Sequence, residues 1–232
     1  MMYSCDADPA LKDFSGFAPL FPLPNVVLFP HALLPLQIFE PRYRQMTADA
    51  LEGERLIAMG LLCPGWQKTS AGANPPIHNM VGLGKIIAHE KLDDGRYYLV
   101  LRGIARATVV TEQQVDLPYR IGQLKICQDL PDGLSDSDRR NRASKLTSLF
   151  ARLFPQVNLQ QLLLHTDEDT PLATLCDILL GSMPLATENS QAFLELLNVD
   201  ARSQKLVDLL EQAVSEAALA SDRTFPPTFS AN

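Results

Sequence analysis

The apolar residues of this chain change their spacing once, between residues 128 and 138, and that change limits the possible folds more than any other feature. Before it, short apolar runs alternate with turn residues, as in β-strands. After it, apolar residues recur every three or four positions, as in α-helices. A linker-like stretch with Pro131 and Gly133 separates the two parts. Strands followed by helices predict an α+β fold.

The first part predicts a set of short strands and one early helix. Prolines interrupt the apolar stretch near residues 20–36, which suits strand ends and edges and excludes a membrane helix there. Pro41 is typical of a first helical position, and Gly53 is typical of a helix end. The predicted strands cover residues 17–23, 26–29, 33–39, 55–62, 81–92, 96–104, 105–113 and 119–127.

The sequence Asp93-Asp94-Gly95 predicts a tight hairpin turn, because Asp-Gly readily adopts the positive φ values of such turns. Residues 97–100 then place apolar side chains on both faces, so we expect this strand to be covered on two sides. A sheet of this many short strands has exposed edges unless it closes on itself. We therefore predict a closed or nearly closed β-barrel. The predicted core includes Phe29, Phe39, Tyr43 and Leu99.

The second part predicts several helices. Ser135 followed by Asp138 is typical of a helix-start cap, and Thr170-Pro171, Thr187 and Asp200 mark three further starts. We expect a barrel subdomain over residues 14–128, a helical subdomain over residues 135–220 and a loose tail over residues 221–232.

Charge and cysteine usage narrow the class of protein. The formal net charge of -7 opposes binding to phosphate backbones. Arg139, Arg140 and Arg142 form the densest basic group, but nearby aspartates predict a solvated helix face instead of a nucleic-acid site. The four cysteines lie far apart, and the first residues do not resemble a signal peptide. We therefore expect a cytoplasmic protein that is not bound to a membrane.

No motif for catalysis, cofactor binding or metal binding emerges from the sequence. It contains no P-loop and no G-x-S-x-G nucleophile motif. Gly82-Leu83-Gly84 is better explained by strand glycines beneath a close neighbour. The four histidines are scattered, and the acidic residues 167–169 suit the positive end of a helix dipole. We predict a non-enzyme without cofactor or metal.

Two segments resemble the N-terminal domain of Lon-type ATP-dependent proteases. The first is FPLPNVVLFP at residues 21–30, continued by LPLQIFEPRYR at residues 34–44. The second is DGRYYLVLRGIAR at residues 94–106. The similarity extends over roughly residues 17 to 215. It implies a PUA-like β-barrel followed by an α-helical bundle.

The resemblance also implies a function. The Lon domain recognises unfolded or tagged protein segments, whereas ATPase and Ser-Lys peptidase modules perform the later steps. We therefore expect a free-standing, non-catalytic module for protein or peptide recognition, and an adaptor or regulator of ATP-dependent proteolysis that has a Lon-type protease as a partner.

The loop of residues 63–79 is the predicted binding surface, because a loop of that length usually serves a purpose. Trp66 is its strongest anchor, since tryptophan buries a large area with little loss of entropy. Packing of Trp66 onto the barrel explains its presence equally well. The candidate peptide-binding residues are Pro64, Trp66, Gln67, Pro75, Pro76 and Ile77.

Two alternatives stay open. The first is RNA binding, because PUA-like barrels in other settings bind RNA. The strand face closest to the aromatic and basic pattern of RNA-binding proteins carries Arg96, Tyr97, Tyr98 and Arg102. Core packing explains these aromatic residues better. A hydrolase could also assemble its site from distant residues, such as a cysteine and a histidine.

Overall fold

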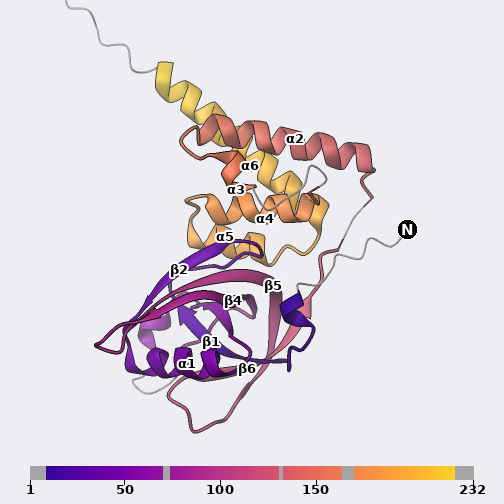
Figure 1. Ribbon diagram of the computed structural model, residues 1–232. Helices are drawn as coiled ribbons and strands as arrows, with labels where there is room; N and C mark the ends of the chain where they lie inside the picture. The colour runs from indigo at the N-terminus through magenta and orange to yellow at the C-terminus, as the bar shows by residue number, and fades with distance from the viewer. Residues whose placement is uncertain (1–8, 70–73, 131–132, 164–169, 223–232) are drawn as a thin grey trace, which may run out of the picture. The chain divides into compact units, whose positions relative to one another are not determined.

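A computed structural model describes residues 9–69, 74–130, 133–163 and 170–222 (Figure 1). Of the predicted tail, residues 223–232 lie outside this range. The chain divides into two compact units: Met1–Asp129 with Asp177–Leu197, and Leu130–Cys176 with Asn198–Asn232. The strands are β1 (Phe17–Leu23), β2 (Leu33–Ile38), β3 (Leu56–Leu61), β4 (Met80–Lys91), β5 (Tyr97–Gln113) and β6 (Arg120–Cys127). The α-helices are α1 (Pro41–Glu52), α2 (Asp136–Leu153), α3 (Leu159–Leu162), α4 (Leu172–Ser182), α5 (Thr187–Leu194) and α6 (Val199–Asp222).

The first unit is built on one six-stranded sheet in the order β2-β5-β4-β3-β1-β6. Strand β6 also pairs with β5, so the pairings from β5 through β4, β3, β1 and β6 close into a ring. Only β1 and β3 are parallel among these pairs. The strands predicted at residues 96–104 and 105–113 are one continuous strand, because β5 is long enough to pair with β2 near its start and with β6 near its end.

Apolar side chains fill both faces of this sheet. In β3, Ile57 and Met59 contribute to one buried cluster, whereas Leu56 and Ala58 contribute to another. The alternation follows from the two-residue period of a strand, and it explains why all of β3 is apolar and buried. Helix α1 covers the first cluster with Tyr43 and other apolar side chains.

The predicted strand at residues 26–29 is absent from the described pairings, and the segment instead crosses the sheet closely. Leu28 and Phe29 are buried. A methyl group at Gly82 would overlap the carbonyl oxygen of Leu28, and one at Gly103 would overlap that of Phe29. The prediction of a close neighbour above Gly82 is therefore confirmed. The flanking prolines and the two glycines explain why the backbone approaches the sheet here without joining it.

The hairpin between β4 and β5 is confirmed. The amide of Leu92 donates to the carbonyl of Arg96 at 2.9 Å, and Gly95 has a φ of 81°. The positive φ is the reason that glycine is needed at this position. The side chain of Arg44, from α1, lies so close beneath Gly95 that an added methyl group would overlap its guanidinium.

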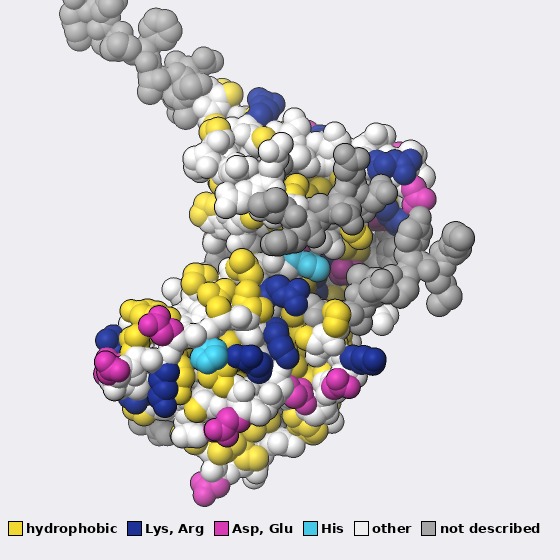
Figure 2. Space-filling view, viewed as in Figure 1, with side chains coloured by type: hydrophobic (Ala, Val, Ile, Leu, Met, Phe, Trp, Pro, Cys, Tyr) yellow, Lys and Arg dark blue, Asp and Glu magenta, His cyan; other side chains and the backbone are white. Residues whose placement is uncertain are grey.

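Two aromatic residues expected in the interior are exposed. Phe39 is 63% exposed and Tyr98 is 46% exposed, whereas Tyr97 and Leu99 are buried. The expectation that β5 is covered on both faces is thus wrong near its start, because successive side chains point to opposite faces and the face that carries Tyr98 is open. Figure 2 shows apolar side chains gathered on the surface over β2 and β5.

Residues 177–197 group with the strands, which divides the helical region expected at residues 135–220. Arg106 of β5 binds the carboxylate of Asp177 in α4 and donates to the carbonyl of Leu194 at 3.0 Å. Gln191 of α5 donates to the carbonyl of Met80 in β4 at 3.0 Å. These bonds join the second half of α4 and all of α5 to the sheet.

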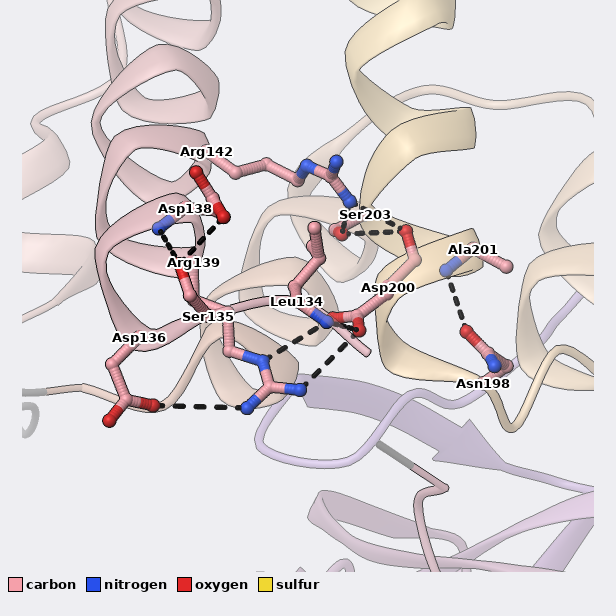
Figure 3. Close-up of polar contacts among 10 residues, drawn as sticks. All are labelled: Leu134, Ser135, Asp136, Asp138, Arg139, Arg142, Asn198, Asp200, Ala201 and Ser203. Carbon is pink, nitrogen blue, oxygen red and sulfur yellow. Dashed lines mark hydrogen bonds and ion pairs between the residues drawn. The ribbon is translucent and has the colours of Figure 1, made fainter. Parts of the chain in front are cut away.

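In the second unit, polar side chains link the starts of α2 and α6 (Figure 3). Ser135 accepts a hydrogen bond from the amide of Asp138 at 3.2 Å, which confirms the predicted cap of α2. The oxygen of Asn198 accepts from the amide of Ala201 at 2.7 Å, so Asn198 caps α6. Asp200, the predicted cap, lies inside the first turn and binds Arg139 instead.

Two further predictions for the helices need correction. Arg142 donates to the carbonyl of Asp200 at 2.9 Å and to the hydroxyl of Ser203 at 3.1 Å, so Arg139 and Arg142 face α6 and not solvent alone. Thr187 begins α5 without capping it, because Ala186 occupies the cap position. None of the helices described is long and apolar enough to cross a membrane.

Candidate functional site

A cleft of about 730 Å³ opens on the first unit. One wall is the end of β1, with Leu20 and Pro22, and a second is the start of α1. Two further segments complete it: the one after β3 that carries Trp66, and residues 112–120, which are the connection between β5 and β6 with the adjoining ends of these strands; this second segment is called the 112–120 loop below. The cleft is therefore formed by segments that are far apart in the sequence.

Trp66 lies in a short 3-10 helix, Trp66–Lys68, on the wall of this cleft. Gly65 precedes it with a φ of 82°, a conformation that glycine adopts without strain. The turn is closed by a bond of 3.2 Å from the amide of Trp66 to the carbonyl of Cys63. The indole side chain is half-buried, so part of it packs on the protein and part is available to a ligand.

The other predicted site residues occupy different positions. Pro75 lines the cleft together with Trp66. Pro64, Gln67 and Pro76 are exposed near it, without being part of its described lining. Ile77 is half-buried and packs toward the sheet, because a methyl group on Gly60 would lie 3.1 Å from its side chain.

The connection between β5 and β6 was not among the predicted site residues. Val115 and Leu117 in this loop are exposed apolar residues that line the cleft. A signal for them existed, since two apolar residues two positions apart precede Pro118 in an otherwise polar turn. They add an apolar surface to the one that Trp66 and Pro75 provide.

Arg120, the first residue of β6, holds the two loops of the cleft in place. Its guanidinium binds both carboxylate oxygens of Glu112, with a distance of 2.7 Å from Nε to Oε2. It also donates to the carbonyl of Pro75 at 2.8 Å. The Arg120 side chain is nearly buried, whereas that of Glu112 is partly exposed, and the contact is a bidentate, charge-assisted one.

At the start of α1, an arginine and a tyrosine also line the cleft. The guanidinium of Arg42 lies over the ring of Tyr43, 4.4 Å from its centroid, and its Nε donates to Glu40 at 2.9 Å. The Tyr43 ring also packs against Phe21, with 4.4 Å between centroids. Burial raises the pKa of Tyr43, and the charge of Arg42 opposes this shift.

Tyr119 lies between this cleft and a smaller hollow of about 250 Å³. Its hydroxyl donates to a carboxylate oxygen of Asp49 at 2.6 Å. Burial, followed by this hydrogen bond, raises the pKa of Tyr119 well above its usual value. The bond fixes the end of the 112–120 loop to α1.

The remaining polar side chains bear on whether catalysis, metal binding or ligand binding is possible. His78 contacts Glu195 at 3.2 Å and His89 contacts Arg55 at 3.2 Å, whereas His165 lies outside the described residues. Within the described ranges, no three His, Cys, Asp or Glu side chains are grouped as for a metal ion. The cleft combines apolar surface with positioned polar groups, a composition typical of sites that bind peptides or small molecules.

A family model matches residues 18–212 of this chain; it describes the ATP-dependent protease La (LON) substrate-binding domain. Among individual proteins, the chain is 26% identical to a Lon protease of Desulfosudis oleivorans over 192 residues, which cover 81% of this chain and 23% of that protein. It is 24% identical to a Lon protease of Dictyoglomus thermophilum over 90% of this chain and 26% of that protein. The chain thus spans about a quarter of the length of these relatives.

Solved structures show the same fold. A Lon N-terminal domain protein from Xanthomonas campestris superposes with a TM-score of 0.58 at 22% identity, covering 83% of this chain and 97% of that one. The N-terminal domain of a Mycobacterium avium complex Lon protease superposes with a TM-score of 0.62 at 14% identity, covering 84% and 98%.

Proposed function

Since this chain belongs to the family of Lon substrate-binding domains, we propose that it recognises polypeptide segments and that it holds them in the cleft beside Trp66. The observation that carries this proposal is the position of Trp66. A half-buried tryptophan shares the cleft with Pro75 and with the exposed Val115 and Leu117. Aromatic anchors in partly desolvated pockets are the residues that contribute most to binding free energy.

The geometry favours an extended and unfolded segment over a folded surface. The apolar residues come from two loops that face a shared hollow, and a single side chain or a short stretch can enter such a hollow. Arg120 and its partners hold those loops, so the cleft is formed before the ligand arrives. Preorganisation of this kind lowers the entropic cost of binding.

Two finer features belong to the same proposal. We interpret the closed ring of strand pairings as the PUA-like barrel of the Lon domain, with the helices after it as the accompanying bundle. A domain that holds polypeptides also suits an adaptor or a regulator of ATP-dependent proteolysis, with unfolded or tagged proteins and a Lon-type protease as its partners.

The chain contains one tryptophan, so its intrinsic fluorescence reports on the cleft directly. Titration with reduced and carboxymethylated ribonuclease A, an unfolded polypeptide without tryptophan, is expected to shift the emission of Trp66. The Trp66→Ala variant is expected to bind the labelled polypeptide roughly tenfold more weakly in an anisotropy assay.

Leu33→Ala is the matched control, because Leu33 is an exposed apolar residue outside the described lining of the cleft. It should bind as the wild type does. Equal loss of binding in the two variants, or an unchanged emission spectrum at saturation, would contradict the assignment of the cleft.

A further inference from the structure

The cleft contains one arginine whose hydrogen-bonding groups are only partly used. Arg120 is fully engaged, since its guanidinium bonds to Glu112 and to the carbonyl of Pro75. Arg42 also lines the cleft, and only its Nε is bonded, to Glu40. Among the described residues, none accepts a hydrogen bond from the two terminal amino groups of Arg42.

Arg42 is nonetheless held in a defined orientation. Its guanidinium stacks over the Tyr43 ring, which fixes the plane of the guanidinium. The hydrogen bond from Nε to Glu40 fixes the direction in which the two terminal amino groups point within that plane. The side chain is 51% exposed, so a ligand can reach it. Two parallel N–H groups on a fixed planar fork match the two oxygens of a carboxylate.

The start of α1 adds to the attraction for a negative charge. Arg42 and Tyr43 lie in the first turn of this helix, where the helix dipole is positive. The Glu40 side chain precedes the helix and makes no capping hydrogen bond to it. The amides at this positive end therefore receive no hydrogen bond from the nearest carboxylate, which binds Arg42 instead.

Two acidic residues, Glu112 and Asp116, line the cleft. Glu112 is neutralised by Arg120. Asp116 is exposed in the loop between β5 and β6. Glu40 offsets part of the charge of Arg42, so the attraction of a ligand carboxylate to the α1 wall comes from the terminal amino groups of Arg42, whereas Asp116 disfavours a negative group near it.

We propose that the cleft selects segments in which a large apolar side chain stands next to a carboxylate. The apolar side chain would pack beside Trp66, and the carboxylate would bind the amino groups of Arg42. An aspartate or glutamate side chain and the C-terminal carboxylate of a polypeptide both supply this group. The inference rests on the proposed role of the cleft in polypeptide recognition.

Short synthetic peptides test this selection through the Trp66 fluorescence. The probes share an N-acetylated sequence with one phenylalanine and differ in the group that follows it: aspartate with an amidated terminus, asparagine with an amidated terminus, or asparagine with a free terminal carboxylate. We expect each of the two carboxylate peptides to bind roughly tenfold more tightly than the neutral peptide. The difference between the two carboxylate peptides identifies the preferred source.

The variant Arg42→Gln should remove this preference, so that the carboxylate peptides bind no more tightly than the neutral peptide. Arg42→Lys retains the charge without the planar fork and should recover only part of the preference. Arg96→Gln is the matched control, because Arg96 is also half-exposed and also bonds through Nε to a carboxylate two positions away, that of Asp94. It should keep the full preference.

The outcomes separate this inference from the proposed function. Equal binding of all three peptides by the wild type, with a clear change in Trp66 emission, would overturn the selection and leave polypeptide recognition in place. Emission that no peptide changes, together with no binding of unfolded ribonuclease A, would overturn both. A carboxylate preference that persists in Arg42→Gln would assign the selection to another residue and overturn the role of Arg42.

Discussion

Arg106 and Asp177 form a bidentate ion pair across 71 positions of sequence, with 2.7 Å from Nη1 to Oδ2 and 2.5 Å from Nη2 to Oδ1. Their side chains are 3% and 2% exposed. Asp129 adds a second carboxylate 3.8 Å from the same guanidinium. The pair fixes α4 to β5, and it accounts for the grouping of residues 177–197 with the sheet.

Removal of one partner from this pair should destabilise the protein strongly. In Asp177→Asn the guanidinium of Arg106 loses its main counter-charge while it stays buried, and such losses typically cost about 3–5 kcal/mol. Urea denaturation followed by circular dichroism measures the change. The double variant Arg106→Met with Asp177→Leu should recover most of the loss, because the two most deeply buried charges are removed together. A double variant as unstable as the single one would contradict this account.

Replacement of Gly103 by alanine should also destabilise the fold. The added methyl group would overlap the carbonyl oxygen of Phe29, so the crossing segment must move away from the sheet. Overpacking of this kind costs about 1–3 kcal/mol. Gly133→Ala serves as the control in the same thermal or urea unfolding experiment, since nothing lies within 4 Å of its added methyl group. A loss of the same size in both variants would refute the steric explanation.

Arg120→Met should loosen the cleft without unfolding the protein. The substitution releases Glu112 and the carbonyl of Pro75, so the loop that carries Trp66 becomes more accessible. We expect stronger quenching of Trp66 fluorescence by acrylamide and roughly tenfold weaker binding of unfolded ribonuclease A. Arg140→Gln, at an exposed position in the other unit, should change neither quantity. Unaltered quenching in Arg120→Met would show that Arg120 does not hold the loop.

Stability should decline at alkaline pH partly because of Tyr119. The pKa of Tyr119 is raised in the folded protein, so the folded state binds this proton more tightly than the unfolded state does. Its contribution is complete below the ordinary tyrosine pKa of about 10 and is lost as the pH rises above that value.

Urea denaturation at several pH values from about 9 to about 11.5 should therefore show a decline in unfolding free energy for the wild type. In Tyr119→Phe the decline should be shallower, though still present, because the pKa of Tyr43 is raised as well. The variant should also be less stable near neutral pH by about 1 kcal/mol, since it lacks the hydrogen bond to Asp49. Identical slopes for the two proteins would rule out this contribution.

Local chemistry made part of the fold predictable. The turn at Gly95 follows from the φ preference of glycine, and the start of α2 follows from the ability of Ser135 to accept from an amide three residues later. Of the contact between Leu28 and Gly82, only the position of the glycine could be predicted. The glycines indicated a close neighbour, but nothing in the sequence identified which segment that neighbour is.

The parts that escaped prediction depend on contacts between distant residues. In the sequence, Asp177 cannot be distinguished from any other polar residue of a helix. Its role follows only from its contact with Arg106, which is distant in sequence. The cleft likewise requires the loop of residues 112–120 to lie next to Trp66, which only the pairing of β5 with β6 brings about. Trp66 and Pro75 could be predicted because they stand in one long loop, whereas Leu117 stands in a shorter loop that gives no such signal.

The closed ring of strand pairings leaves β2 as the terminal strand of the order, paired to β5 alone among the described strands. Its central Pro35 carries no N–H, so the backbone there cannot serve as a continuous template for an added strand. A protein with the proposed role of binding unfolded segments would meet aggregation-prone chains. In that role, Pro35 in the terminal strand would disfavour the addition of such a segment to the sheet, and the ligand would be bound through its side chains in the cleft.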